Sequence, residues 1–211
     1  METKGIFITF EGPDGSGKTT VSTAVYQKLK DEGFDVIYTR EPGGIDIAEQ
    51  IRSVILDPKN TAMDNRTEAL LYAASRRQHL VEKIIPALKK NQVVICDRFV
   101  DSSLVYQGIA RQIGIEEVYR INQFAIDDYM PEMTVYLDIS AEKGLARLQN
   151  REFKDRLDQE QLSFHQMVEK GYHTIMERFP ERFRVVDASQ PKEKVIEDAY
   201  EIVKKQILSH E

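Results

Sequence analysis

Short apolar runs alternate with longer amphipathic stretches along the chain. The runs are partly β-branched and are bounded by turn-forming residues, which is typical of buried strands. They predict strands at residues 6–10, 36–39, 93–96, 134–139 and 184–186. Strands that alternate with helices build a parallel sheet covered on both faces. We therefore expect an α/β fold of three layers around a parallel five-stranded sheet.

Apolar residues spaced by three or four positions predict the intervening helices. Val21, Val25 and Leu29 share one face of the first helix. Thr67 is the expected cap of a long helix, and Pro86 should kink or restart that helix. Other helices are predicted at about residues 47–55, 115–127, from 142, at 162–179 and at 195–203.

Length and composition are ordinary for a globular chain of one domain. The 211 residues are 41% hydrophobic and 30% charged, and no apolar run is long enough to span a membrane. The first apolar run is too short for the core of a signal peptide, and one cysteine excludes an internal disulfide, so we expect a cytoplasmic protein. The net charge of −6 disfavours nucleic acid and anionic membranes as partners. An anionic ligand would need local cations and backbone N–H groups.

The segment Gly12–Thr19 (GPDGSGKT) fits the pattern G-x-x-x-x-G-K-[ST] of a phosphate-binding loop. A predicted strand precedes this segment and a predicted helix follows it. Phosphate binding requires this order, because the loop's backbone N–H groups surround the phosphate at the positive end of the helix. Lys18 can reach terminal phosphates, and the Thr19 hydroxyl can bind Mg²⁺. An ordinary glycine turn is the alternative. A dinucleotide-binding turn is disfavoured because Thr20 stands where its third glycine would be.

The residues after the third predicted strand narrow the class of protein. Asp97 follows that strand and is itself followed by Arg98, where hydrolases of this class usually carry a water-activating glutamate. The Asn-Lys-x-Asp segment with which a GTPase reads its base is absent from the sequence. These features favour phosphoryl transfer to a bound acceptor over hydrolysis.

Five short motifs follow one another between about residues 5 and 205. They are Phe10-Glu11-Gly12, Thr39–Gly44 (TREPGG), Asp97–Ser103 (DRFVDSS) with Tyr106–Gly108, Asp155–Asp158 (DRLD) and Asp187–Pro191 (DASQP). Together they resemble the thymidylate kinases, specifically the bacterial branch. The resemblance implies transfer of phosphate from ATP to dTMP, giving dTDP, with Mg²⁺ as cofactor. It also implies a single P-loop kinase domain over residues 1–211, a lid segment at about 143–158, and a homodimer.

The same resemblance implies a donor site built on the phosphate loop. Lys18 would be catalytic, and Thr19 and Asp97 would lie on the metal side. Gln190 would lie near adenine. The implied ATP-binding residues are Gly12, Pro13, Asp14, Gly15, Ser16, Gly17, Lys18, Thr19, Thr20, Arg147 and Gln190.

On the acceptor side, the resemblance implies that Arg98 clamps the dTMP phosphate and that Asp14 faces the sugar and phosphate, both as catalytic residues. Tyr72 would stack on thymine, where the family usually has phenylalanine, and Arg76 would donate to thymine O4. The implied dTMP-binding residues are Asp14, Glu41, Arg52, Tyr72, Ser75, Arg76, Arg98, Ser102, Ser103 and Gln107. For Tyr72 core packing is the alternative, and for Arg52 it is a solvated helix position.

The phosphate loop offers no cation besides Lys18, although phosphoryl transfer benefits from another. The resemblance implies that the lid supplies it, with Arg151 the first choice and Arg147 the second. A surface arginine is the alternative for each.

Two rival functions remain open at this point. One is a kinase for another nucleoside or nucleotide on the same fold. The other is a nucleotide-binding switch with little catalysis. No zinc site is expected, because the four histidines and Cys96 have no metal-ligand spacing.

Overall fold

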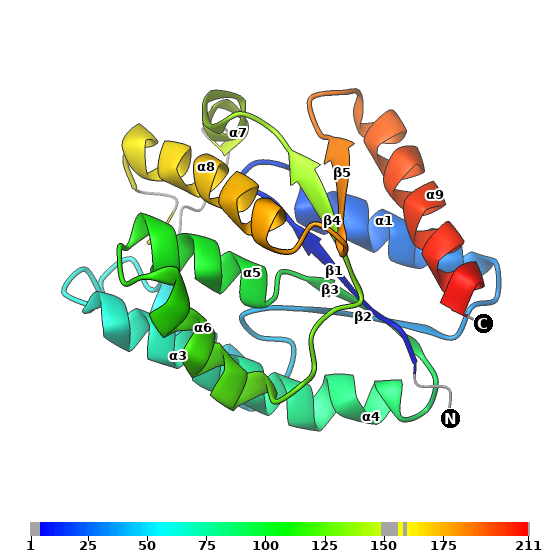
Figure 1. Cartoon of the computed structure of the whole chain (residues 1–211), viewed down its shortest axis with the longest axis horizontal. Helices are drawn as coiled ribbons and strands as arrows, with labels where there is room; N and C mark the ends of the chain where they lie inside the picture. Colours follow the sequence, from blue (N-terminus) through cyan, green and yellow to red (C-terminus); the bar gives the residue numbers. More distant parts are fainter. Residues whose placement is uncertain (1–4, 149–155, 158–159, 211) are drawn as a thin grey trace.

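The computed structural model describes residues 5–148, 156–157 and 160–210. Its five strands are all parallel and lie in the order β2-β3-β1-β4-β5 (Figure 1). They are β1 (Phe7–Glu11), β2 (Val36–Arg40), β3 (Val93–Asp97), β4 (Met133–Asp138) and β5 (Phe183–Asp187). The predicted α/β architecture with a parallel five-stranded sheet is confirmed.

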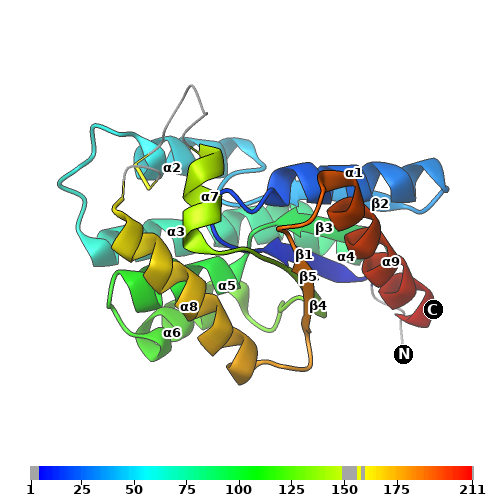
Figure 2. The same cartoon turned by 90° about the horizontal axis from the view of Figure 1, so that it is seen from above.

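Helices lie on both faces of this sheet (Figures 1 and 2). On one face α1 (Lys18–Asp31) packs beside α9 (Lys192–His210). The elements of the other face are α3 (Asn65–His79), η1 (Leu80–Ile84), α4 (Ile85–Leu88), α5 (Val100–Ser103), η2 (Leu104–Ala110), α6 (Ile115–Ile126) and α8 (Leu162–Arg178). Two further helices are α2 (Asp46–Leu56), which packs on α3, and α7 (Ala141–Leu148), which packs on α8. No helix of the described part is long and apolar enough to cross a bilayer.

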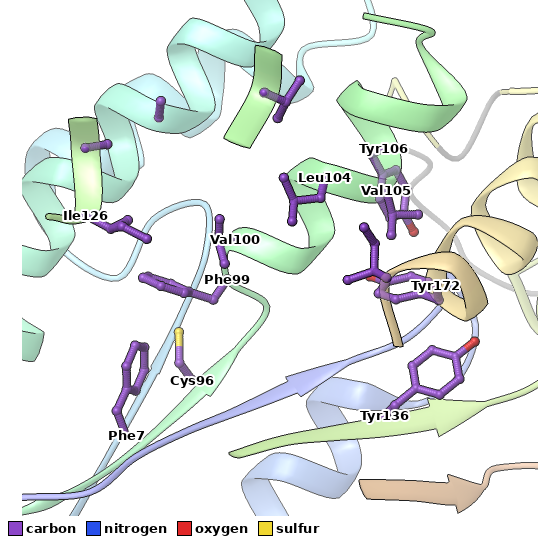
Figure 3. Close-up of a cluster of buried hydrophobic side chains, with 14 of the residues drawn as sticks. Phe7, Cys96, Phe99, Val100, Leu104, Val105, Tyr106, Ile126, Tyr136 and Tyr172 are labelled. Atoms are coloured by element: carbon purple, nitrogen blue, oxygen red, sulfur yellow. The ribbon is translucent and has the colours of Figure 1, made fainter. Parts of the chain in front are cut away.

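Alternate residues of β1 supply two separate hydrophobic cores, because successive strand residues point to opposite faces. Ile8 and Phe10 pack toward α1 and α9. Phe7 packs on the other face, edge-on against Phe99 (Figure 3). The same alternation places Glu11 on the face of Phe7, where its carboxylate meets α5 and α8.

Two details of the predicted helices differ in the structure. Thr67 does not cap α3: the cap is Asp64, whose carboxylate accepts hydrogen bonds from the N–H groups of Arg66 and Thr67. Pro86 restarts the helix as expected, since the π-helical turn η1 precedes it and α4 begins beside it.

The segment from Val100 to Ala110 was not predicted as an element, yet it is helical through α5 and η2. Nearly every side chain in it is buried, so it lacks the alternation of apolar and polar residues that marks a surface helix (Figure 3). This buried segment forms one wall of the site described below.

Candidate active site

The phosphate loop joins the end of β1 to the start of α1. Gly15 and Gly17 have φ values of +78° and +89°, which glycine adopts without strain. α1 begins at Lys18 with no side-chain cap, so the N–H groups of its first turn can face an anion. The cavity beside the loop is lined by Asp14, Gly15, Gly17, Lys18, Thr19, Thr20, Arg40, Glu41, Arg52, Asp97 and Arg98.

Lys18 is buried and folded back onto its own loop. Its Nζ donates to the carbonyl oxygens of Gly12 at 2.8 Å and Pro13 at 2.7 Å, with the Ser16 hydroxyl 3.4 Å away. Burial and the nearby Arg98 guanidinium lower the pKa of Lys18 to about 7. An incoming phosphate would oppose both effects, because its negative charge favours the ammonium form.

The Thr19 hydroxyl and the Asp97 carboxylate meet beside the loop, with Thr19 Oγ1 donating to Asp97 Oδ2 at 2.5 Å. The other Asp97 oxygen, Oδ1, is buried and has no hydrogen-bond partner among the described residues. Mg²⁺ is usually held by one or two protein oxygens together with phosphate oxygens and water. The hydroxyl and the unpartnered carboxylate oxygen therefore fit such an ion.

The helix α7 packs closely against the phosphate loop, where Gly144 of the helix meets Gly15 of the loop. A Cβ at Gly15 would lie 2.1 Å from the carbonyl oxygen of Gly144, so only glycine permits this approach. Arg147, on the last turn of α7, donates to the carbonyls of Gly15 at 3.3 Å and Ala188 at 3.0 Å. A further cavity there is lined by Gly15, Ser16, Gly17, Thr20, Val21, Arg147, Leu148, Ala188, Gln190, Lys192 and Val195. The predicted residue Arg151 lies outside the described residues.

A second, partly enclosed cavity adjoins the phosphate-loop cavity. Its empty volume, counted together with the open solvent at its mouth, is about 540 Å³. It is lined by Asp14, Glu41, Pro42, Arg52, Leu56, Tyr72, Arg76, Arg98, Phe99, Ser102, Ser103, Tyr106, Gln107 and Leu157. We call it the acceptor cavity. Asp14, Glu41, Arg52 and Arg98 line both cavities, so they form the junction between them.

Arg98 stands at this junction in a left-handed conformation with φ of +70°. Its guanidinium pairs with the Asp14 carboxylate and donates to the Ser102 hydroxyl at 3.2 Å. Burial alone would raise the pKa of Asp14, but the Arg98 and Lys18 cations lower it below its ordinary value. A guanidinium has five N–H donors, so further donors remain for a phosphate.

Arg76 is 2% exposed and held on all sides. Its Nε donates to Glu41 at 2.7 Å, one terminal nitrogen donates to Ser103 at 3.1 Å and to Asn122, and the other donates to the Phe99 carbonyl at 3.0 Å. Four of its five N–H groups are thus used. One N–H remains without an acceptor among the described residues, on the wall of the acceptor cavity.

Tyr72, one turn before Arg76 on α3, also lines the acceptor cavity. Ser75 does not: it is fully buried inside the helix packing, and its hydroxyl has no partner among the described residues. Arg52 donates to the Pro42 carbonyl at 2.9 Å and lines both cavities.

Several residues outside the predicted site set either line the two cavities or hold the lining residues in place. Tyr106 donates to Asp14 at 2.8 Å, and Arg40 lines the phosphate-loop cavity. Glu11 accepts from the Phe99 N–H at 2.7 Å and from the Ser102 hydroxyl at 2.6 Å, which fixes the turn around Arg98. Only their place in the quoted motifs marked these residues in the sequence. Glu68 and Asn122 carried no signal, because their partners are distant along the chain.

Known proteins are similar to this chain in sequence and in structure. The sequence model of the thymidylate kinase family matches residues 10–199. A thymidylate kinase of Bacillus velezensis is 59% identical over 201 residues, covering 94% of this chain and 95% of its own. One of Clostridium novyi is 57% identical over 197 residues, covering 92% and 96%. The crystal structure of thymidylate kinase from Ehrlichia chaffeensis superposes with a TM-score of 0.77 at 31% identity, covering 95% and 99%. Because the match spans nearly the whole of each protein, this chain belongs to the thymidylate kinase family.

Proposed function

We propose that this chain transfers the terminal phosphoryl group of ATP to dTMP, giving ADP and dTDP. The observation that carries the proposal is the junction at Asp14 and Arg98, where the phosphate-loop cavity opens into the acceptor cavity. Two phosphates bound at the two ends of this junction would face each other. Such alignment is most of what phosphoryl transfer requires of a protein.

The base is read by the far wall of the acceptor cavity. Tyr72 offers a ring for stacking, and Arg76 offers its one remaining N–H to a carbonyl oxygen. Ser103, held by Arg76 at 3.1 Å, and Gln107 complete the polar edge. Donor and acceptor groups of this kind match thymine, which carries two carbonyl oxygens and an N–H between them.

In the transfer step, an oxygen of the dTMP phosphate forms a bond to the terminal phosphorus of ATP while the bond from that phosphorus to the bridging oxygen breaks. Arg98 holds the acceptor phosphate, and Asp14 holds Arg98 in place. Lys18 exchanges a loop carbonyl for a phosphate oxygen and meets the charge that moves to ADP. We propose that the additional cation comes from the lid, from Arg151 first and Arg147 second.

Thr19 and Asp97 would hold Mg²⁺ through the hydroxyl and the unpartnered carboxylate oxygen. When bound, Mg²⁺ neutralises charge on the terminal phosphates. We expect activity with ATP to be lost after chelation and to return with added Mg²⁺.

A coupled assay for ADP with a panel of nucleoside monophosphates tests the function. We expect dTMP to be the preferred acceptor. Preference for another nucleoside or nucleotide would support the rival kinase, and nucleotide binding without turnover would support a switch.

We also propose that the chain forms a cytoplasmic homodimer. Exposed apolar side chains lie on three neighbouring helices: Ile47 and Val54 on α2, Leu70 on α3 and Phe124 on α6. Phe124 is 90% exposed, and large apolar residues grouped on neighbouring helices are typical of a protein interface. Sedimentation at micromolar concentration should give twice the monomer mass. A monomer alone under these conditions would contradict the proposal.

A further inference from the structure

Gln107 is 1% exposed and lies on the wall of the acceptor cavity. Its side-chain amide nitrogen, Nε2, donates to Glu68 Oε1 at 2.8 Å. No described residue donates a hydrogen bond to the amide oxygen of Gln107. One end of the amide is therefore tied to the protein, and the other end is left for whatever occupies the cavity.

Glu68, which holds this amide, is itself 1% exposed on the inner face of α3. Its carboxylate pairs with the guanidinium of Arg156 and lies 3.4 Å from that of Arg111. Arginine N–H groups can only donate, so both carboxylate oxygens of Glu68 act as hydrogen-bond acceptors. The Gln107 amide must then present its NH₂ group to Glu68.

We infer that Glu68 is a positioning residue that makes the acceptor site selective for a base with an N–H on its edge. By fixing the NH₂ end of Gln107, it leaves only the amide oxygen toward the cavity, and this oxygen accepts from such an N–H. The inference rests on the proposed function and deepens it, because it assigns the choice between pyrimidines to a residue that lies outside the cavity lining.

Thymine and cytosine differ in their hydrogen-bonding group at N3, so an amide oxygen at this position distinguishes them. Thymine has a donor at N3, which the Gln107 oxygen can accept. Cytosine has an acceptor at N3 and would face the same oxygen lone pair to lone pair. A buried polar edge that loses its partner discriminates strongly, because both groups are then left desolvated.

A Glu68→Gln substitution keeps the shape of the side chain but removes this control. The new amide has one oxygen, which the guanidinium groups of Arg111 and Arg156 require as their acceptor. Its NH₂ group is left for Gln107, which must turn its own oxygen toward it. The Gln107 NH₂ group then faces the cavity, where it repels the thymine N3–H and suits an N3 acceptor.

The test compares dTMP with 5-methyl-dCMP, which keeps the methyl group and changes only the base edge. We expect the ratio of kcat/KM for dTMP to that for 5-methyl-dCMP to fall at least about tenfold in Glu68→Gln. The KM for ATP should change less than twofold. An unchanged ratio in the folded variant would overturn the inference while leaving the proposed function intact. A wild-type protein without preference for dTMP would overturn both.

The matched control is Glu160→Gln. Glu160 is a second carboxylate on Arg111, at 2.7 Å, and has no hydrogen bond to Gln107. We expect its ratio to stay within twofold of wild type. If the kcat/KM ratio fell equally in both variants, the effect would come from the loss of a carboxylate on Arg111, and the inference would be overturned.

A double-mutant cycle with Gln107→Met separates positioning from general stability. If Glu68 acts through the amide, adding Glu68→Gln to Gln107→Met should change the ratio less than twofold. Additive effects would contradict the inference.

A measurement on the wild-type protein does not depend on any variant folding. The side-chain NH₂ protons of Gln107, assigned by their loss in Gln107→Met, should be protected from solvent exchange both with and without dTMP. Protection that appears only with dTMP would show the NH₂ group facing the base and would overturn the inference.

Discussion

The acceptor side of this site consists mainly of side chains, whereas the donor side consists mainly of backbone groups. The acceptor cavity is walled by side chains that already hold one another, as Arg76 shows with four hydrogen bonds and 2% exposure. The phosphate loop instead offers backbone N–H groups, and its lysine is engaged with the loop's own carbonyls. The first side is organised before a ligand arrives, whereas the second exchanges internal hydrogen bonds for ligand contacts.

This difference teaches where selectivity and catalysis reside. A rigid polar wall discriminates between bases, because a wrong base leaves buried groups unpaired. A loop that rearranges around phosphate can place its cation where charge develops during transfer. We therefore expect donor-side substitutions to lower kcat and acceptor-side substitutions to raise KM for dTMP.

The largest effect should come from Lys18→Ala. Because Lys18 meets charge on the transferring phosphate, kcat should fall by about 10³ or more. The fold should persist, because burial of this charge is unfavourable in the folded protein. Burial and the nearby Arg98 lower the pKa of Lys18 to about 7. Single-turnover transfer and circular dichroism check both parts. A folded variant with near-normal turnover would remove Lys18 from the mechanism.

Arg151→Ala should lower kcat by about 10² with small changes in the dissociation constants of ATP and dTMP, if the lid supplies the second cation. Calorimetry beside single-turnover kinetics separates binding from chemistry. If ATP affinity collapses while kcat holds, Arg151 contacts the ground state and Arg147, beside the loop, becomes the candidate. Arg156 is the less suitable substitute, because it pairs with Glu68 on the acceptor side.

Arg98→Ala tests the acceptor side. The loss of a paired phosphate contact should weaken dTMP binding by about 1.5–3 kcal/mol, or roughly 10- to 150-fold. Binding of ATP should change little, and Arg98→Lys should recover only part of the loss because it lacks the planar fork. Calorimetric titration with each nucleotide is the measurement. Weaker ATP binding with unchanged dTMP binding would mean that Arg98 belongs to the donor site and not to the acceptor site.

Substitutions at Tyr72 test whether its ring stacks on the base or only packs in the core. Tyr72→Ala should weaken dTMP binding by about 1–3 kcal/mol, by analogy with base–aromatic stacking, whereas Tyr72→Phe keeps the ring and should be nearly silent. Equal dTMP affinity in wild type and Tyr72→Ala, together with a lower melting temperature, would return Tyr72 to the core.

The last effect concerns stability, not binding or turnover, and involves Glu11, behind the junction. Burial, followed by the charge of Asp101, raises its pKa from 4.5 to about 7. Between these values the folded protein holds a proton that the unfolded chain has lost. The contribution of Glu11 to the free energy of unfolding therefore decreases as pH rises from about 4.5 to 7, by at most about 1.4 kcal/mol per pH unit.

Glu11→Gln removes this contribution, while the hydroxyls of Ser102 and Tyr172 can reverse to accept from the new amide. Urea unfolding of both proteins at pH 5, 6, 7 and 8 gives the difference between them. Their free energies should converge or cross as pH rises. Parallel curves would mean that Glu11 does not titrate in this range.

The sequence alone determined the framework of the molecule. Apolar runs gave the five strands, because a buried strand needs a continuous apolar segment. The phosphate loop could be read directly, since its glycines, lysine and threonine are contiguous and act through local backbone geometry. The cap of α3 was misplaced by three residues, because both Asp64 and Thr67 are residues that cap helices.

Only the tertiary structure decided how the acceptor site is held. The helix over 100–110 escaped sequence analysis because burial on all sides erases its periodicity. The pairing of Gln107 with Glu68 joins residues 39 positions apart, and that of Arg76 with Asn122 joins residues 46 apart. A sequence pattern reports neighbours within a few residues, whereas the orientation of a buried amide or guanidinium is set by whichever partners the fold brings to it.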